Sequence, residues 1–354
     1  MTVITRRHLA RLAGAGAVSA PFIRPSAAQT RSITVALYSG IFQENYQAAV
    51  IEPFMRAHPG IRVTAYPMPN SAQTLGSLRA QKAAPQVDVA VMDVGVARAG
   101  TDEGLLAPLT AEALPVLKEL GERAITPGVN GVALTYDSLA LLYAPDAVTP
   151  LPTSWKVLWN PAYKGKIAIL GAPDLVGIAF TLVADRLFGG TDYKASLEKG
   201  IAAISDLAPS VLTWDPRPDP YSFIVGGSAV LGVGWNARGQ LYSQQSAGKL
   251  AVAQPDEGSV FQINAITLVN NAPQPDAARA FIAYALGTEA QKAFSERMFY
   301  APTNPNAQIA PAALARTVAS PDRMQKMLAV DWLEVAKGRD RLNEQWRRRI
   351  LTRT

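Results

Sequence analysis

Short apolar runs alternate with amphipathic stretches along most of the chain. Residues 33–38 and 61–66 are apolar enough to be buried strands, and the helix expected between them has Tyr46, Ala49, Val50 and Phe54 on one face. This order predicts a strand–helix–strand unit with a right-handed crossover. Pro53 lies inside the helical stretch and should kink it, because proline lacks a backbone N–H and clashes with the preceding turn.

The alternation continues toward the C-terminus. Residues 87–92 are too apolar for a strand with one wet face, which predicts a place in the middle of a parallel sheet. Apolar residues spaced three and four apart over 278–286 predict a core-facing helix. Thr288 and Gln291 fit a capping box at the start of the next helix. The pattern as a whole predicts the α/β class.

In open parallel sheets, ligands bind where loops leave the carboxyl ends of the strands. The predicted strand ends of this chain hold small, polar or aromatic residues. The candidate ligand-binding residues among them are Ser39, Gly40, Asp93, Trp235, Asn236, Gln262 and Asn264. Two roles are open for Asp93: a counter-charge for a cationic ligand, or the cap of the helix that follows it.

Composition narrows the possible chemistry. The 354 residues include no cysteine and only two histidines, of which His8 lies near the N-terminus. A cysteine nucleophile, a disulfide or a histidine-rich metal centre cannot be built, so we predict no catalytic residues and no metal. Residues 232–237 formally match a dinucleotide-binding pattern, but Trp235 would crowd the pyrophosphate, and we therefore expect no cofactor.

The first 28 residues fit a twin-arginine export signal. Arg6 and Arg7 precede an apolar run over 12–23 and a small-residue cleavage site that ends at Ala28. We expect cleavage there and a periplasmic mature protein without a membrane span, because no later window has about 18 uninterrupted apolar residues. The excess of arginines lies in this leader and in the tail after residue 340, so the net charge of +6 does not indicate a nucleic-acid partner.

Four motifs in a fixed order resemble those of bacterial periplasmic solute-binding proteins of ABC importers, of the polyamine-binding type. They are TSWKVLWNPAYKGKIAI at 153–169, LGVGWN at 231–236, PDEGSVF at 255–261 and FYAPTN at 299–304. The resemblance implies a two-lobed periplasmic-binding-protein fold of type II, in which each lobe is a mostly parallel sheet flanked by helices. It also implies two crossover hinge strands, which we place near Tyr136 and Asn264. Lobe 1 would comprise residues 31–135 plus 265–354, and lobe 2 residues 136–264.

The resemblance also bears on the solute. Trp235 and Tyr300 match aromatics that polyamine binders place against methylenes and ammonium groups. Gln262 and Asn264 stand where that pattern has an aromatic and a carboxylate, whereas Asp93 resembles an acid of thiamine-binding relatives. We expect a small polar solute, nitrogen-containing and polyamine- or thiamine-like. Because amides donate as well as accept, an organic acid or phosphonate is the alternative.

Two function classes follow from these observations. The first is a monomeric carrier that captures a small-molecule solute between two lobes, with Tyr136 among its ligand-binding residues, and delivers the solute to ABC permease subunits. The second is an exported hydrolase or lyase without metal, using Asp93, Tyr136 or Tyr300 as acid or base. The motif order favours the carrier, and the near absence of histidine weighs against the enzyme.

Overall fold

The computed structural model describes residues 30–352. The predicted export signal and its cleavage site lie outside the described residues. Among the helices of this part of the chain, none combines the length and apolar character needed to cross a membrane.

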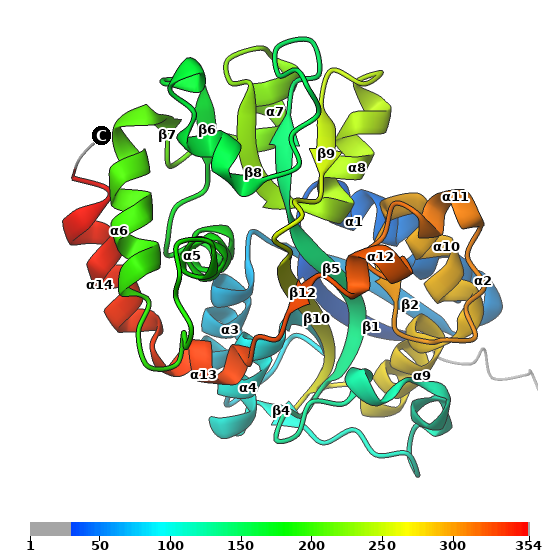
Figure 1. Cartoon of the computed structure of the whole chain (residues 1–354). Coiled ribbons are helices and arrows are strands. Elements are labelled where there is room, and N and C mark those ends of the chain that lie inside the picture. The colour runs from blue at the N-terminus through cyan, green and yellow to red at the C-terminus, as the bar shows by residue number, and fades with distance from the viewer. Residues whose placement is uncertain (1–29, 353–354) are drawn as a thin grey trace, which may run out of the picture.

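One continuous sheet order runs through the molecule, β2-β1-β3-β10-β5-β8-β6-β7 (Figure 1). At one end β1 lies parallel to β2 and β3, and at the other β6 lies parallel to β7 and β8. The bounds of these strands are β1 Arg31–Tyr38, β2 Ile61–Met68, β3 Val89–Asp93, β5 Val132–Tyr143, β6 Ile167–Ile169, β7 Val211–Thr213, β8 Leu231–Trp235 and β10 Ser259–Val269. Four short strands, β4 Leu106–Ala107, β9 Ala251–Ala253, β11 Ala301–Pro302 and β12 Met327–Leu328, pair with β5 or β10.

Strands β5 and β10 pass from one half of the sheet to the other. Residues 132–138 of β5 pair with β10, and two of them also pair with β11, whereas residues 139–143 pair with β8 and β9. The two long strands are antiparallel, and their register shifts between Asn264 and Ala265. The centre of the sheet is therefore antiparallel and its two ends are parallel, because the chain must leave one half and return to it.

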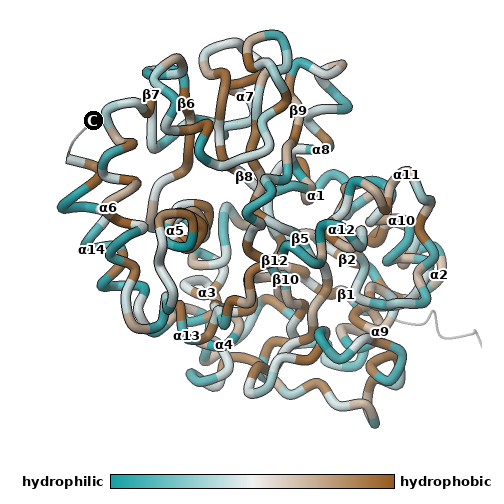
Figure 2. The backbone as a smooth tube through the Cα atoms, viewed as in Figure 1, coloured by the Kyte–Doolittle hydropathy of each residue, from teal (hydrophilic) through white to brown (hydrophobic). Residues whose placement is uncertain are grey.

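Helices pack on both halves of this sheet. They are α1 Ile41–Tyr46, α2 Glu52–Ala57, α3 Ser71–Ala80, α4 Val94–Asp102, α5 Leu175–Leu187, α6 Glu198–Leu207, α7 Pro220–Val225, α8 Asn236–Gln245, α9 Pro275–Leu286, α10 Thr288–Met298, α11 Pro311–Leu314, α12 Pro321–Met324, α13 Trp332–Lys337 and α14 Arg339–Arg349. Figure 2 shows α5 as largely hydrophobic, which fits its burial against β5, β8 and β10. The predicted strand at 87–92 is β3, buried from Val89 to Met92 between β1 and β10.

The two main apolar cores follow the two halves of the sheet. One contains β1, β3 and α9, and the other contains β6, α5 and α6. Trp332 and Trp346 pack in the second core, and α14 lies beside α6 in Figure 1. Trp346 anchors α14 to the half that holds α5 and α6, whereas α13 packs mainly on α4, so the C-terminal helices contact both halves of the molecule. The lobe boundaries themselves stay a prediction.

Helix starts differ in how they are capped. Ser154 caps the short helix Trp155–Trp159 by accepting a hydrogen bond from the Lys156 N–H. The predicted capping box at Thr288 is wrong, because α10 begins after Gly287 without a side-chain cap. Gln291 instead lies buried and donates to the carbonyl oxygens of Leu134 and Ala285, so its amide joins elements distant in sequence.

Pro53 interrupts its helix in an unexpected way. Residues 47–51, between α1 and α2, form a turn of π-helix, and Pro53 lies at the start of α2. A π-helical turn spaces its hydrogen bonds one residue wider, so it absorbs the missing proline N–H without ending the helix.

Candidate binding cleft

A cavity of about 400 Å³ lies between the two halves of the sheet, at the carboxyl ends of their strands. Residues of β1, α3 and β3 line one side, and residues of α5, α7, β8 and α8 line the other. The lining includes the acidic residues Asp93, Asp174, Asp215 and Asp219 and the basic residues Arg217, Arg238 and Arg339. Neither sign of charge dominates the cavity.

Helix N-termini gather around this cavity. The residues that precede α3, α4, α5 and α8, namely Asn70, Asp93, Asp174 and Trp235, all line it. Free N–H groups and the helix dipole make such ends partly positive, which favours acidic side chains and the carboxylate of a ligand.

Asp93 is held by two side chains and does not cap the helix that follows it. Its carboxylate accepts hydrogen bonds from Ser71 Oγ at 2.7 Å and from Gln262 Nε2 at 3.0 Å. No side-chain cap forms at the start of α4, so the capping role proposed from the sequence is absent. Burial raises the pKa of Asp93, and the hydrogen bonds from Ser71 and Gln262 lower it only in part. A ligand cation beside the carboxylate would lower this pKa.

Asn264 and Gln262 both line the cavity but differ in whether they have a free hydrogen-bonding group. The Asn264 amide is used within the protein, because its Oδ1 accepts from the Tyr38 hydroxyl at 3.0 Å and its Nδ2 donates to Thr135 Oγ1 at 2.9 Å. Gln262 is 7% exposed, and its Oε1 has no hydrogen-bond partner among the described residues. Gln262 therefore keeps a buried acceptor beside Asp93.

Arg238 lines the cavity from the other half of the molecule. It lies in the first turn of α8, and its guanidinium makes no hydrogen bond or ion pair with any residue from 30 to 352. Burial lowers the pKa of Arg238, but Tyr221, Tyr300 and Asp219 raise it by more, so the guanidinium stays charged. A half-buried cation without an ion pair is suited to an incoming carboxylate.

The other charged groups of the cavity are already engaged. The Asp174 carboxylate caps α5 by accepting from the Val176 N–H. Asp219 accepts from the Ser222 N–H at 2.7 Å and from the Tyr242 hydroxyl at 2.8 Å. Arg217 pairs with Asp215 at 2.8 Å, and Arg339 donates to the Pro173 carbonyl oxygen at 3.0 Å.

Two of the predicted aromatics line the cavity. Trp235 is half-buried, and its backbone N–H donates to the Tyr221 hydroxyl at 2.6 Å. Tyr300 stacks on Phe294, with 5.6 Å between ring centroids. The structure therefore brings together Asp93, Trp235, Gln262, Asn264 and Tyr300 of the residues predicted from the sequence.

The structure leaves Ser39, Gly40, Tyr136 and Asn236 outside the cavity lining. At the end of β1 it is Tyr38 that reaches the cavity, and Gly40 lies exposed at the start of α1. Tyr136 packs against Phe261, because successive side chains of a strand point to opposite faces and Thr135 takes the face toward Asn264. Asn236 is fully buried and donates to the Arg316 carbonyl oxygen.

Sequence reasoning did not identify Tyr38, Ser71, Arg238 or Asp219 as cavity residues. Arg238 could have been found from its position in the sequence, because it follows Trp235, the last residue of β8, by three residues and so lies in the first turn of the next helix. Ser71 and Asp219 carried signals of helix starts only, because serine and aspartate are common at those positions for capping alone.

Comparison with known proteins gives this arrangement a context. Residues 49–322 match the model of a family described as bacterial extracellular solute-binding protein. A gamma-aminobutyric acid-binding protein of Pseudomonas aeruginosa is 27% identical over 300 residues, which cover 80% of each protein. A spermidine/putrescine-binding periplasmic protein of Salmonella typhimurium is 28% identical over 199 residues, 54% of this chain and 53% of that protein.

The fold has close counterparts among solved structures. An ABC transporter substrate-binding protein from Bradyrhizobium japonicum superposes with a TM-score of 0.77 at 18% identity, covering 90% of this chain and 98% of that one. The architecture is the α/β periplasmic-binding-protein fold, as the motif order predicted.

Proposed function

Because this chain belongs to the bacterial extracellular solute-binding proteins, it is the non-enzymatic substrate-binding component of an ABC importer, and we propose that its solute is a small amino-acid-like zwitterion. The observation that carries the proposal is the pair of unlike charges on the two sides of the cleft. Asp93 with the Gln262 acceptor offers a place for an ammonium group, and Arg238 offers one for a carboxylate.

The balance of charge in the cleft supports a zwitterion over a polyamine. A diamine would place its second ammonium group near Arg238, and like charges brought together in a desolvated site cost several kcal/mol. Putrescine or spermidine, named for one relative, fits this cleft less well than gamma-aminobutyric acid, named for another. The thiamine-like solute predicted from the sequence shares the difficulty that it offers Arg238 no carboxylate.

An organic acid or phosphonate is disfavoured by the Asp93 side of the cleft. A dicarboxylate or phosphonate would satisfy Arg238, but its second anionic group would lie near Asp93. That placement would push the already raised pKa of Asp93 higher and leave Gln262 Oε1 without a donor.

A zwitterion would also join the two halves of the protein. We propose that residues 31–135 and 265–354 form lobe 1 and that residues 136–264 form lobe 2, with α14 of lobe 1 packed against α6 of lobe 2. Strands β5 and β10 would act as hinges, and Trp235 and Tyr300 would flank the solute. Contacts on both sides then favour the closed form over the open one.

The cellular setting follows the same proposal. The protein would be exported by the twin-arginine signal at residues 1–28, act as a monomer in the periplasm and present its solute to ABC permease subunits. No nucleic acid takes part in this scheme.

A thermal-shift screen tests the solute class. The panel should contain 4-aminobutyrate and other amino acids, spermidine and putrescine, thiamine, organic acids and phosphonates. A solute at 100 times its dissociation constant stabilises the native state by about 2.7 kcal/mol, which is readily seen as a rise in melting temperature. We expect amino acids with separated charges to give the largest shifts. A largest shift from a polyamine or a polyanion would refute the assignment.

A further inference from the structure

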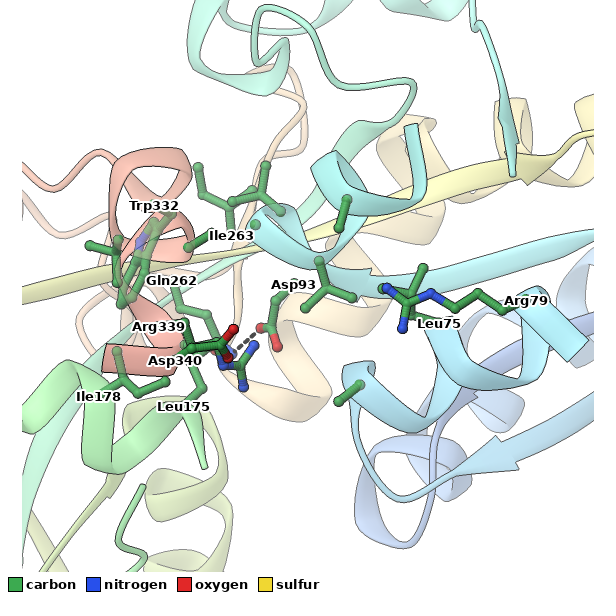
Figure 3. A pocket seen from close by; sticks show the side chains of 17 residues that line it. Leu75, Arg79, Asp93, Leu175, Ile178, Gln262, Ile263, Trp332, Arg339 and Asp340 are labelled. Atoms are coloured by element: carbon green, nitrogen blue, oxygen red, sulfur yellow. Dashed lines mark hydrogen bonds between the residues drawn. The ribbon is translucent and has the colours of Figure 1, made fainter. Parts of the chain in front are cut away.

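A second cavity of about 340 Å³ adjoins the cleft (Figure 3). Asp93, Gln262, Leu175 and Arg339 line both cavities, so they form the boundary between them. The second cavity, which we call the inner chamber, is bounded by α4, the start of α5 and the C-terminal helix α13.

The interior of the inner chamber is apolar. Val94, Ile178 and Trp332 are among its buried lining residues. The charged lining residues Arg79 and Asp340 lie toward solvent, and Arg79 is already paired with Glu103. A group that enters from the cleft therefore meets charge at the boundary, buried hydrocarbon next, and the charged Arg79 and Asp340 only where the chamber opens to solvent, which favours an apolar substituent.

The boundary itself holds an unsatisfied acceptor. Gln262 is 7% exposed, its Nε2 donates to Asp93 Oδ1 at 3.0 Å, and its Oε1 has no partner among residues 30–352. Figure 3 shows this hydrogen bond between the two side chains at the edge of the chamber. An ammonium nitrogen placed here can donate one hydrogen to the Asp93 carboxylate and a second to Gln262 Oε1.

A nitrogen with two donated hydrogens has two further substituents. One must lead back into the cleft toward Arg238, and the other can lead into the inner chamber. We propose that the inner chamber is a second subsite, which takes an apolar substituent carried on the amine nitrogen of the solute. The solute class is then an N-substituted amino acid. This inference rests on the proposed function, since it assumes that an ammonium group binds at Asp93.

The test compares two probes on the full-length mature protein by isothermal titration calorimetry. The first is 4-aminobutyrate and the second is its N-benzyl derivative, 4-(benzylamino)butyrate. Burial of a phenyl ring in the chamber should make the N-benzyl probe bind about tenfold more tightly, after the cost of ordering its rotatable bonds.

Two variants fill the inner chamber without touching the cleft. Ala99 on α4 and Ala336 on α13 line the chamber alone, so Ala99→Leu and Ala336→Leu should weaken the N-benzyl probe about tenfold or more. Both should leave the affinity for 4-aminobutyrate within about twofold. Ala312→Leu is the matched control, because Ala312 is an exposed helical alanine like Ala336 and lines neither cavity.

The outcomes separate the subsite from the function on which it rests. If 4-aminobutyrate binds while the N-benzyl probe binds more weakly, the subsite is refuted and the proposed function stands. If the leucine variants weaken both probes alike, or neither probe, the substituent does not occupy the chamber and the subsite is again refuted. If neither probe binds the unaltered protein, the zwitterion assignment fails, and the subsite fails with it.

Discussion

Replacing Asp93 by asparagine should separate solute binding from stability. The substitution keeps the shape of the side chain and removes its charge. The Ser71 hydroxyl can still donate to the new amide oxygen, and a flip of the Gln262 amide, whose Nε2 now faces Asp93, lets Gln262 Oε1 accept from the new NH₂ group. No helix cap is lost, because Asp93 does not cap α4. The free protein should therefore fold normally.

The expected loss appears only with the solute. Removing one partner of a desolvated charge pair costs about 2–5 kcal/mol, which corresponds to a loss of affinity of roughly 30-fold to a few thousand-fold. The melting temperature of the free protein at pH 7 should stay the same or rise, because burial raises the pKa of Asp93 and a neutral side chain avoids that cost. Calorimetric titration and a melt on the same sample measure both quantities.

Asp219→Asn is the matched control for this experiment. Asp219 lines the same cavity, but Tyr242 and the Ser222 N–H hold its carboxylate, and its charge acts on Arg238. Removing that charge should leave the binding of a carboxylate unchanged or slightly tighter. If Asp93→Asn lowers the melting temperature strongly while the affinity is kept, Asp93 is a structural residue and the reasoning is refuted.

Three further predictions concern Asp137, Trp346 and Trp235. Burial raises the pKa of Asp137 to about 7 from 3.8, so the native state binds this proton more tightly than the unfolded chain and loses stability as pH rises from about 4 to about 7. Asp137→Asn should remove up to about 4 kcal/mol of that loss. Urea unfolding at pH 4 and pH 8 measures it, and the same pH dependence in both proteins would contradict the prediction. Trp346 is fully buried, donates to Thr181 Oγ1 at 2.9 Å and packs edge-on against Trp214. Trp346→Ala should therefore lower the free energy of unfolding in urea by about 3–5 kcal/mol. A decrease below about 1 kcal/mol would show that Trp346 does not anchor α14. Trp235 is half-buried and lines the cavity, so Trp235→Ala should weaken solute binding with little change in melting temperature, whereas a large fall in melting temperature at unchanged affinity would make the indole structural.

The fold could be predicted from the sequence because its signals are local and repeated. The alternation of apolar strands with amphipathic helices survives in β1, β2, β3 and α9 with nearly the expected bounds. Ordered motifs then distinguished this fold from other α/β architectures. The antiparallel pairing at the centre of the sheet was not foreseen, since an apolar strand such as 87–92 looks the same beside a parallel or an antiparallel neighbour.

The site could be predicted only in part, because contact with a cavity depends on single-residue register. Tyr38 and Ser39 are neighbours at the end of β1, yet only Tyr38 lines the cavity. The same applies to β5, where Thr135 bonds to Asn264 and the adjacent Tyr136 turns to Phe261. The predicted strand ends indicate which loops lie at the cavity. Which side chain of each loop points into the cavity depends on the register of the folded strands.

Two features could not be predicted because they depend on packing between residues distant in sequence. The arginine-rich end of the chain is typical of a solvated tail, but Trp346 of α14 packs in the second core. Arg238 resembles any exposed helical arginine in sequence. Only the assembled structure shows that it faces a cavity with no ion pair to any described residue.

Unlike charges on the two sides of the cleft are proposed to select a zwitterion. Calorimetric titration can compare 4-aminobutyrate, putrescine and succinate, which each have four carbons and differ in the charge at each end. We expect 4-aminobutyrate to bind at least about 100-fold more tightly than either of the others, since each of them brings one like-charged pair into the cleft. Tighter binding of putrescine or of succinate would refute the zwitterion assignment.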